Sequence, residues 1–242
     1  MKYFLLDTNI TAGYYLPLSL ENKKAKKYIE EILNYLRLNP NDYFSYIPNF
    51  CIAEVFNVFY KYAYGKKWNK EVKKNGYITK SILSKLIKSF ERDVHNGSFF
   101  YHYELSRYHI LSINLVSSVD NYYLIRKKKN VTPCSTFDKL IITMGIELSF
   151  IHGPENVCIL TADNRLADLL KVCKKEYSET MIKKLNLDFA GNFTGKKFSK
   201  DIFPHCLNLN KVTTKELVDI FGNWPLNIKK PPSLNKYFRY VK

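Results

Sequence analysis

"YFLLDTNI" occupies residues 3–10, and its aromatic and apolar run ends on Asp7, Thr8 and Asn9. A short continuous apolar run of this kind is typical of a buried strand in a parallel sheet. Small polar residues also stop strands, so Asp7 taken alone has two interpretations. It is either a strand terminator or a side chain held at the carboxyl end of the sheet, where open α/β sheets bind ligands.

The same pattern returns in "NVCILTADNRLADLLKVC", residues 156–173. Residues 157–160 are continuous, apolar and β-prone, as in a central parallel strand. That strand is expected to end on Thr161, Ala162 and Asp163, with a helix starting directly afterwards. Two buried strands, each terminated by a small polar residue and an aspartate, indicate a doubly wound α/β fold.

Between these strands the periodicity predicts further elements. Residues 20–39 carry apolar side chains at helical spacing, 40–48 resemble a turn and a second strand, and 49–65 form a largely buried helix that contains Glu54. We expect a loop over 11–19. Ser135 or Thr136 is expected to cap a helix with Asp138 in its first turn, where a negative charge is favoured.

The two long remaining regions are harder to assign from periodicity. Residues 66–130 are strongly basic and are expected to form helices over or beside the sheet. The chain after about residue 175 is less regular, although 212–224 begins like a capping box at Thr213 or Thr214.

The charge balance is the strongest global signal. Lys and Arg number 38 against 22 Asp and Glu, a formal charge of +16, and 46% of residues are hydrophobic. A chain this basic is expected to meet a polyanion, with nucleic acid as the leading candidate. The alternative is a chain whose surfaces are generally Lys-rich. No run of residues has the length of a membrane span or the form of a signal peptide, so we expect a cytoplasmic protein that does not enter a membrane.

Cysteine and histidine indicate no metal site of their own. The five cysteines are scattered without a CxxC pair, and Cys51 and Cys158 lie in apolar stretches typical of the core. The five histidines show no ligand spacing, and His102 and His109 are expected on a helix as packed or surface residues.

Four carboxylates stand at informative places: Asp7, Glu54, Asp138 and Asp163. Strand carboxyl ends and helix N-termini converge on one edge of a doubly wound sheet, where these groups would repel one another without a cation. Clustered carboxylate oxygens suit Mg²⁺ or Mn²⁺, which support phosphodiester hydrolysis. Taken singly, each has a structural alternative: strand end, salt bridge, helix charge or N-cap. Thr8, Asn9 and Thr161 are expected to support the carboxylates.

Four blocks in this order resemble the PIN-domain nuclease family, which includes VapC-type toxins: "LLDTNI", "IAEVFNVF", "FDKLIITMGIEL" and "ILTADNRL". The resemblance implies a three-layer α/β/α sandwich with a central parallel sheet and a Mg²⁺- or Mn²⁺-dependent ribonuclease. It implies that the four carboxylates bind the metal. It also allows a protein inhibitor, the antitoxin, and a homodimer.

The chain is longer than a compact toxin of this family. We therefore expect a PIN-like domain over 1–175, with 66–130 as a helical, basic insertion between the second and third motifs, and a C-terminal extension over 176–242 packed on or beside it. Asp120 is a rival for the third carboxylate. Asp138 is preferred because one helix separates it from the last motif strand.

Three functions remain open at this stage. The first is a metal-dependent endoribonuclease that binds the RNA backbone through basic residues of 61–92 and 126–129. The second is an RNA-binding or assembly module without catalysis. The third is a phosphatase with Asp7 as nucleophile, which is disfavoured because Asn9 stands where a second aspartate is expected. The backbone-binding candidates are Lys66, Lys67, Lys70, Lys73, Lys74, Arg126, Lys127 and Lys128.

Overall fold

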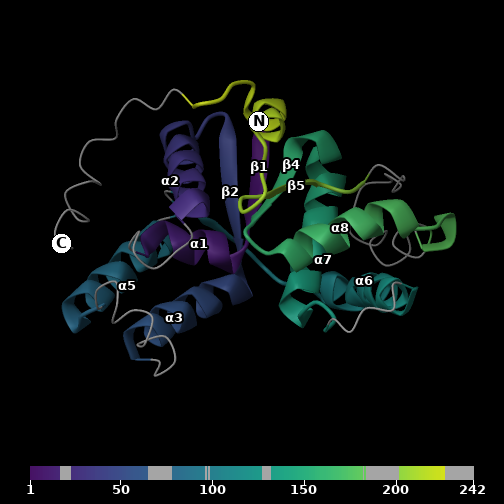
Figure 1. Cartoon of the computed structure of the whole chain (residues 1–242), viewed down its shortest axis with the longest axis horizontal. Coiled ribbons are helices and arrows are strands. Elements are labelled where there is room, and N and C mark those ends of the chain that lie inside the picture. Colours follow the sequence, from purple (N-terminus) through teal and green to yellow (C-terminus); the bar gives the residue numbers. More distant parts are fainter. Residues whose placement is uncertain are drawn as a thin grey trace.

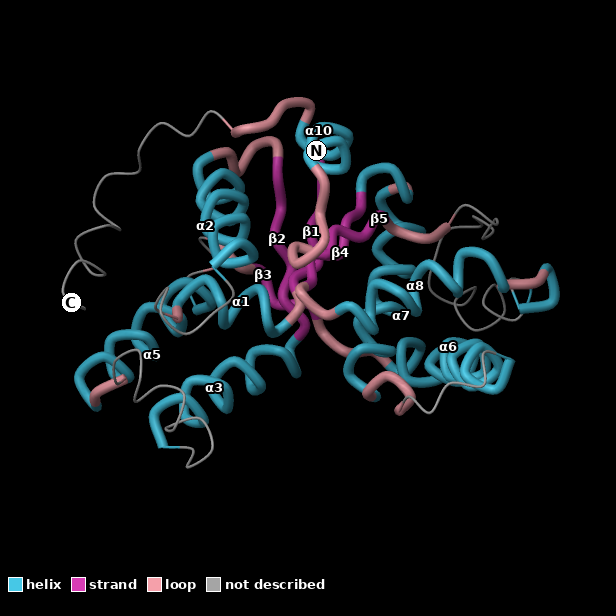
Figure 2. Tube along the Cα trace, viewed as in Figure 1, coloured by secondary structure: helices cyan, strands magenta, loops and turns pink. Residues whose placement is uncertain are grey.

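A five-stranded parallel sheet forms the centre of the molecule (Figure 2). The computed structural model describes residues 1–16, 23–64, 78–95, 97, 99–126, 132–181, 183 and 202–226. The strands are β1 (Lys2–Leu6), β2 (Tyr43–Pro48), β3 (Tyr101–Tyr103), β4 (Val157–Thr161) and β5 (His205–Asn208). Their order across the sheet is β3-β2-β1-β4-β5, and every pairing is parallel. The two strands expected from the repeated pattern, β1 and β4, are therefore neighbours at the centre.

Helices cover both faces of this sheet, as Figure 1 shows. On one side lie α1 (Thr8–Tyr15), α2 (Lys23–Leu38), α3 (Asn49–Tyr64) and α5 (Lys80–His95). On the other lie α6 (Arg107–Arg126), α7 (Thr136–His152) and α8 (Asn164–Glu176). A 3₁₀ turn η2 (Pro154–Asn156) precedes β4, and α10 (Thr214–Phe221) follows β5. The expected three-layer α/β/α architecture with a central parallel sheet is confirmed.

Helix α1 occupies part of the segment for which the sequence predicts a loop. The loop prediction is wrong for residues 11–15, and 17–19 lie outside the described residues. Gly13 suggested a turn, but a Cβ there would meet Ile29 Cδ1 at 3.0 Å, so glycine lets α1 approach α2 closely. The buried Lys26 ammonium donates to the carbonyls of Gly13 (2.5 Å) and Tyr14 (3.1 Å), where a cation is favoured at the end of a helix.

Within 66–130 the described residues form two helices, one short strand and loops. Helices α5 and α6 agree with the prediction, but β3 lies between them and forms an edge of the sheet beside β2. This strand contains His102, for which a helix was predicted, so that prediction is wrong. Three residues are too few to show the alternation that identifies a strand in a sequence.

The described C-terminal residues are joined to the same sheet. Strand β5 pairs with β4, with His205 opposite Cys158. Helix α10 begins with a capping box between Thr213 and Glu216, as the sequence indicates, and Phe221 stacks on Phe4 at 5.5 Å between ring centroids. The domain division at residue 175 remains a prediction, but a strand from beyond it completes the sheet.

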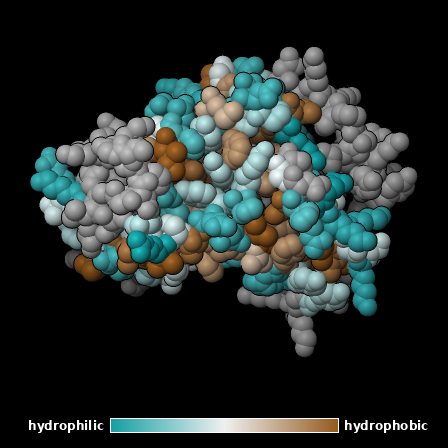
Figure 3. Space-filling view, turned by 180° about the vertical axis from the view of Figure 1, so that it is seen from behind, coloured by the Kyte–Doolittle hydropathy of each residue, from teal (hydrophilic) through white to brown (hydrophobic). Residues whose placement is uncertain are grey.

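The surface and the cysteines fit a globular chain. On the face that Figure 3 shows, hydrophobic residues stand in small groups among hydrophilic ones, which is ordinary for a protein surface. All five cysteines are free, and Cys51 and Cys158 are buried, which confirms them as core residues. Among the described helices none combines the length and the apolar character needed to cross a bilayer.

Candidate active site

The site lies where the chain changes direction across the sheet. From β1 the chain proceeds to β2 and β3 on one side, whereas β4 and β5 lie on the other. The loops after β1 and β4 therefore diverge and leave a crevice at the carboxyl edge, the usual ligand site of open α/β sheets. The backbone N–H of Asp7 donates to the Leu160 carbonyl (3.0 Å), so the two strand ends lie together.

Asp7 ends β1 and is almost fully buried, with 5% of its surface exposed. Its Oδ2 accepts hydrogen bonds from Thr161 Oγ1 (2.6 Å) and Asn9 Nδ2 (2.5 Å). The pKa of Asp7 is raised to about 7, mainly by burial; the nearby charges of Asp138 and Asp163 also raise it, and the Thr161 bond lowers it. The carboxyl is thus only partly ionised near neutral pH.

Asp7 occupies the N-cap position of α1 but does not act as a cap. An N-cap aspartate ordinarily accepts from the second or third backbone N–H of its helix. The Asp7 side chain makes no such bond, whereas Asp163, the N-cap of α8, accepts from the N–H groups of Arg165 (2.6 Å) and Leu166 (3.4 Å). Termination of β1 therefore does not explain why a carboxylate stands at residue 7.

Thr161 and Asn9 tie the two strand-end loops together. Thr161 Oγ1 donates to Asp7 and accepts from the backbone N–H of Asp163 (2.8 Å). The Asn9 side chain donates to Asp7 and accepts from the Ala162 N–H (2.8 Å). Asn9 and Thr161, two of the three residues predicted to support the site, thus contact Asp7 and the loop after β4.

Glu54 reaches the site from α3, on the other side of the β1 loop. Its Oε2 accepts a hydrogen bond from Thr8 Oγ1 (2.6 Å). Because Thr8 directly follows Asp7, this bond fixes the α3 carboxylate beside the end of β1. Lys61 stands two turns further along α3 and lines the same cavity.

Asp138 lies in the first turn of α7, where it takes part in a capping box. Ser135 Oγ accepts from the Asp138 N–H (3.1 Å), and the Asp138 carboxylate accepts from the Ser135 N–H (3.0 Å). Burial raises the pKa of Asp138, and the Asp163 charge raises it further, while the Ser135 bonds and Arg165 act in the opposite direction. Ser135 rather than Thr136 is the N-cap.

These elements enclose a cavity of about 340 Å³. Three of the four predicted carboxylates line it, from the loop after β1, from α3 and from α7, and Asp163 is not part of its wall. Asp163 instead lies close enough to raise the pKa of Asp7 and of Asp138. The lining residues are Asp7, Thr8, Asn9, Ala12, Glu54, Asn57, Val58, Lys61, Tyr62 and Asp138.

The donor chemistry of this cavity suits a hard divalent ion. Among the described residues no three His, Cys, Asp or Glu side chains stand close enough together to hold one ion. Mg²⁺, however, is usually bound through one or two carboxylates, with water and substrate phosphate completing its octahedron. One or two of the carboxylates that line this cavity, together with water and substrate phosphate, fit an ion held in that way. Asp7, Glu54 and Asp138 are the residues from which its protein ligands would come.

Other predicted residues lie elsewhere. Arg126 is at the end of α6, where it pairs with Glu176 (3.8 Å) beside a second cavity, away from the carboxylates. The lysines at 66, 67, 70, 73, 74, 127 and 128 lie outside the described residues. His109 is buried on α6 and bonded to Glu147, in agreement with a packed residue.

Asn57 and Asn210 belong to the site but are not among the predicted residues, whereas Lys61 lies within the range 61–92 whose basic residues are predicted to bind the RNA backbone. Asn57 and Lys61 line the cavity from α3, and their spacing of three and seven from Glu54 places all three on one helix face. Asn210 donates to the Ala162 carbonyl (2.5 Å) and so supports the loop after β4. No local pattern could have indicated Asn210, because the contact joins residues far apart in the chain.

Comparison with known proteins finds similarity to a solved structure, but no family model matches the sequence and no curated protein matches it. Among solved structures, the chain is similar to the crystal structure of VapBC2 from Rickettsia felis bound to a DNA fragment from their promoter, at 16% identity and a TM-score of 0.39. The match covers 69% of this chain and 92% of that one. A likeness of that size supports no conclusion about fold or function.

Proposed function

We propose that this chain is a Mg²⁺- or Mn²⁺-dependent endoribonuclease of the PIN type. One observation carries the proposal: Asp7, Glu54 and Asp138 come from three separate elements and line one cavity at the point where the strand order reverses. Asp163 stands beside them. The sequence blocks that resemble the PIN family contain these four residues.

Each residue has a role in this proposal. Asp7, Glu54 and Asp138 would supply the protein ligands of the ion, and Asp163 would add negative charge from the loop after β4. Thr161 holds the Asp7 carboxylate in place and favours its ionised form. A divalent ion bound here would lower the pKa of water and stabilise negative charge on phosphate oxygens.

The reaction is hydrolysis of a phosphodiester. The water oxygen bonds to phosphorus, the bond from phosphorus to the leaving oxygen breaks, a carboxylate takes the proton of the water and solvent protonates the leaving oxygen. The net charge of +16 and the Lys61 ammonium at the cavity favour a polyanionic substrate. The same proposal includes an RNA substrate, an antitoxin-like inhibitor and a homodimer, which the resemblance implies, and a cytoplasmic location, which the sequence predicts.

The test is cleavage of end-labelled RNA by purified protein with Mn²⁺, Mg²⁺ or EDTA. Asp7→Asn is the site variant. Asp93→Asn is the matched control, because Asp93 is also a buried aspartate (2% exposed) but is bonded to Arg37 and Tyr15. We expect cleavage that needs metal, survives in Asp93→Asn and is lost in Asp7→Asn.

Other outcomes contradict the proposal. Equal cleavage by Asp7→Asn and the unmodified chain would point to a contaminant or to another site. Binding of RNA without cleavage under either metal would favour the module without catalysis. Release of phosphate from small phosphomonoesters would favour the phosphatase, although the Asn9 amide is bonded on both sides and cannot supply a titratable proton.

A further inference from the structure

We infer that Asp120 is a positioning residue for the carboxylate site: it fixes the N-termini of α7 and α8, which carry Asp138 and Asp163, and it holds two cations away from them. The inference rests on the proposed function, because it assigns Asp120 a part in binding the divalent ion. Asp120 lies on α6, which contributes no residue to the cavity wall.

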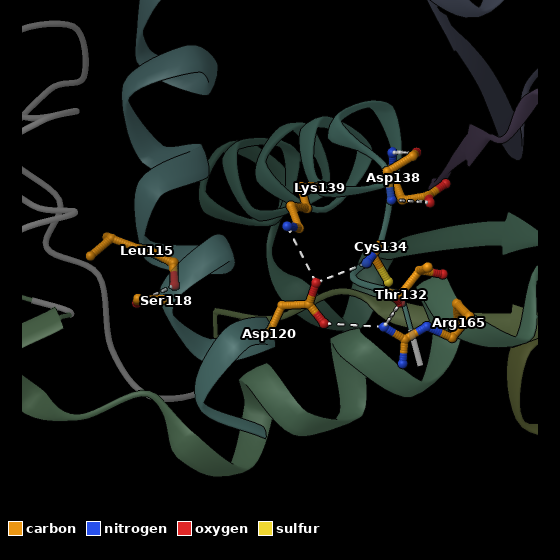
Figure 4. Close-up of polar contacts among 9 residues, drawn as sticks. Leu115, Ser118, Asp120, Thr132, Cys134, Asp138, Lys139 and Arg165 are labelled. Carbon is orange, nitrogen blue, oxygen red and sulfur yellow. Dashed lines mark hydrogen bonds and ion pairs between the residues drawn. The ribbon is translucent and has the colours of Figure 1, made fainter. Parts of the chain in front are cut away.

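The Asp120 carboxylate is buried, with 1% of the residue exposed, and both of its oxygens are engaged. Oδ2 accepts from the backbone N–H of Cys134 (2.9 Å) and pairs with Lys139 Nζ (3.3 Å). Oδ1 pairs with Arg165 (3.3 Å), whose guanidinium also donates to the Thr132 carbonyl (3.0 Å). Figure 4 shows Asp120 pointing at these three donors and not at Asp138. The Asp120 carboxylate thus binds donors of the protein itself and is not a third ligand for the ion.

The three donors are neighbours of the site residues in the chain. Lys139 directly follows Asp138, and Cys134 directly precedes Ser135, whose hydroxyl caps α7. Arg165 lies two residues after Asp163, in the first turn of α8. One buried carboxylate therefore joins the starts of two helices that come from distant parts of the sequence, and it sets where their acidic residues stand relative to each other.

The charges of this cluster also act on the site. Asp120 with Lys139 and Arg165 has a net charge of about +1, and the Arg165 charge reaches Asp138, where it lowers the pKa of that carboxyl. Loss of the Asp120 charge leaves two cations unneutralised beside the site, and Lys139 and Arg165 each lose an ion-pair partner. Both effects weaken the binding of a divalent ion at the site. At separations on the order of 10 Å with an intermediate dielectric, one added positive charge weakens divalent binding by roughly tenfold.

A purely structural ion cluster would have a different consequence. Removal of one partner from a buried ion pair destabilises a protein strongly wherever the pair lies. Such a role predicts a loss of stability without a specific change in metal affinity. Asp93 provides the comparison, since it is equally buried and pairs with Arg37 at 3.2 Å on the opposite side of the sheet.

The experiment is a titration with Mn²⁺, in which free ion is followed by electron paramagnetic resonance. It compares the full chain with Asp120→Asn, Asp93→Asn and the double variant Asp120→Asn/Lys139→Met, each first shown to be folded by circular dichroism. We expect Asp120→Asn to bind Mn²⁺ about tenfold more weakly and Asp93→Asn to bind as the unmodified chain does. The double variant restores the cluster charge to about +1, so it should recover part of the affinity.

The outcomes separate the inference from the proposed function. An unmodified chain that binds no Mn²⁺ overturns the proposed function itself. Binding by the unmodified chain with equal affinity in Asp120→Asn, or equal weakening in Asp93→Asn, overturns the role of Asp120. Should Asp120→Asn not fold, Lys139→Met alone decides, because it removes a cation while Arg165 stays paired: tighter Mn²⁺ binding supports the inference, and unchanged or weaker binding refutes it.

Discussion

Replacement of Asp7 by asparagine is expected to stabilise the metal-free protein at alkaline pH. The pKa of Asp7 rises from 3.8 to about 7 on folding. Between these values the unfolded chain is ionised at this position and the folded chain is protonated, so the free energy of unfolding falls as pH rises from about 4 to about 7. Asparagine has the same shape, can accept the bonds from Thr161 and Asn9 through its oxygen, and carries no charge.

The magnitude follows from the pKa values. At about 1.4 kcal/mol per pH unit, the whole rise from 3.8 to about 7 corresponds to a cost of about 4 kcal/mol. About 3 kcal/mol of this lies between pH 5 and pH 8. As the pH rises from 5 to 8, the free energy of unfolding of Asp7→Asn should therefore fall by about 3 kcal/mol less than that of the unmodified chain.

The assay is urea denaturation at pH 5 and pH 8 in EDTA for both proteins. Burial lowers the pKa of His152 and of His205, which makes stability rise with pH, but these groups are common to both proteins and cancel in the difference. Addition of Mn²⁺ at pH 8 should stabilise the unmodified chain and leave the variant unchanged. Parallel pH profiles for the two proteins would refute the burial argument for Asp7.

Further substitutions at four positions probe the supports of the site, the helix caps and the core. Thr161→Val removes the hydrogen bond that lowers the pKa of Asp7. Mn²⁺ binding at pH 7, measured by titration, should therefore weaken by about tenfold. Thr161→Ser keeps the hydroxyl and should bind Mn²⁺ as the unmodified chain does. Ser135→Ala and Thr213→Ala each break a capping box and should each cost about 1 kcal/mol in urea denaturation, but only Ser135→Ala should also slow RNA cleavage. Gly145→Ala places a Cβ 2.7 Å from Ile159 Cδ1 and should lower the free energy of unfolding by about 1–3 kcal/mol at any pH. A urea denaturation midpoint equal to that of the unmodified chain would contradict this prediction.

The sequence predicts the parts of this fold that depend on local pattern. Strands β1 and β4 are continuous apolar runs, and the two helices that carry Glu54 and Asp138 are rich in apolar residues. Because parallel strands end at one edge, the order of these elements was enough to predict where their acidic residues lie.

The missed elements are short or have an atypical composition. Strand β3 has three residues and β5 has four, and each is held by pairing with one neighbouring strand. A glycine usually marks a turn, yet Gly13 lies inside α1 and lets this helix pack closely against Ile29 of α2. These features depend on tertiary contacts, which no local window contains.

Asp120 shows the same limit within the site. Its partners Lys139 and Arg165 lie 19 and 45 residues further along the chain, so no spacing rule indicates them. Sequence analysis could identify Asp120 only as one more acidic residue near the expected position. Its distinction from Asp138 depends on which donors surround each carboxylate after folding.

The difference between Asp7 and Asp163 extends this reasoning to the roles of the carboxylates. Asp163 accepts hydrogen bonds from two backbone N–H groups as the N-cap of α8, so it has a structural role in starting this helix. Asp7 stands at a cap position without capping, and its burial costs stability near neutral pH. A buried carboxyl that costs stability near neutral pH and caps no helix is best explained by what it binds. On this argument Asp163→Asn, which keeps a capping side chain, should retain more Mn²⁺ affinity than Asp7→Asn.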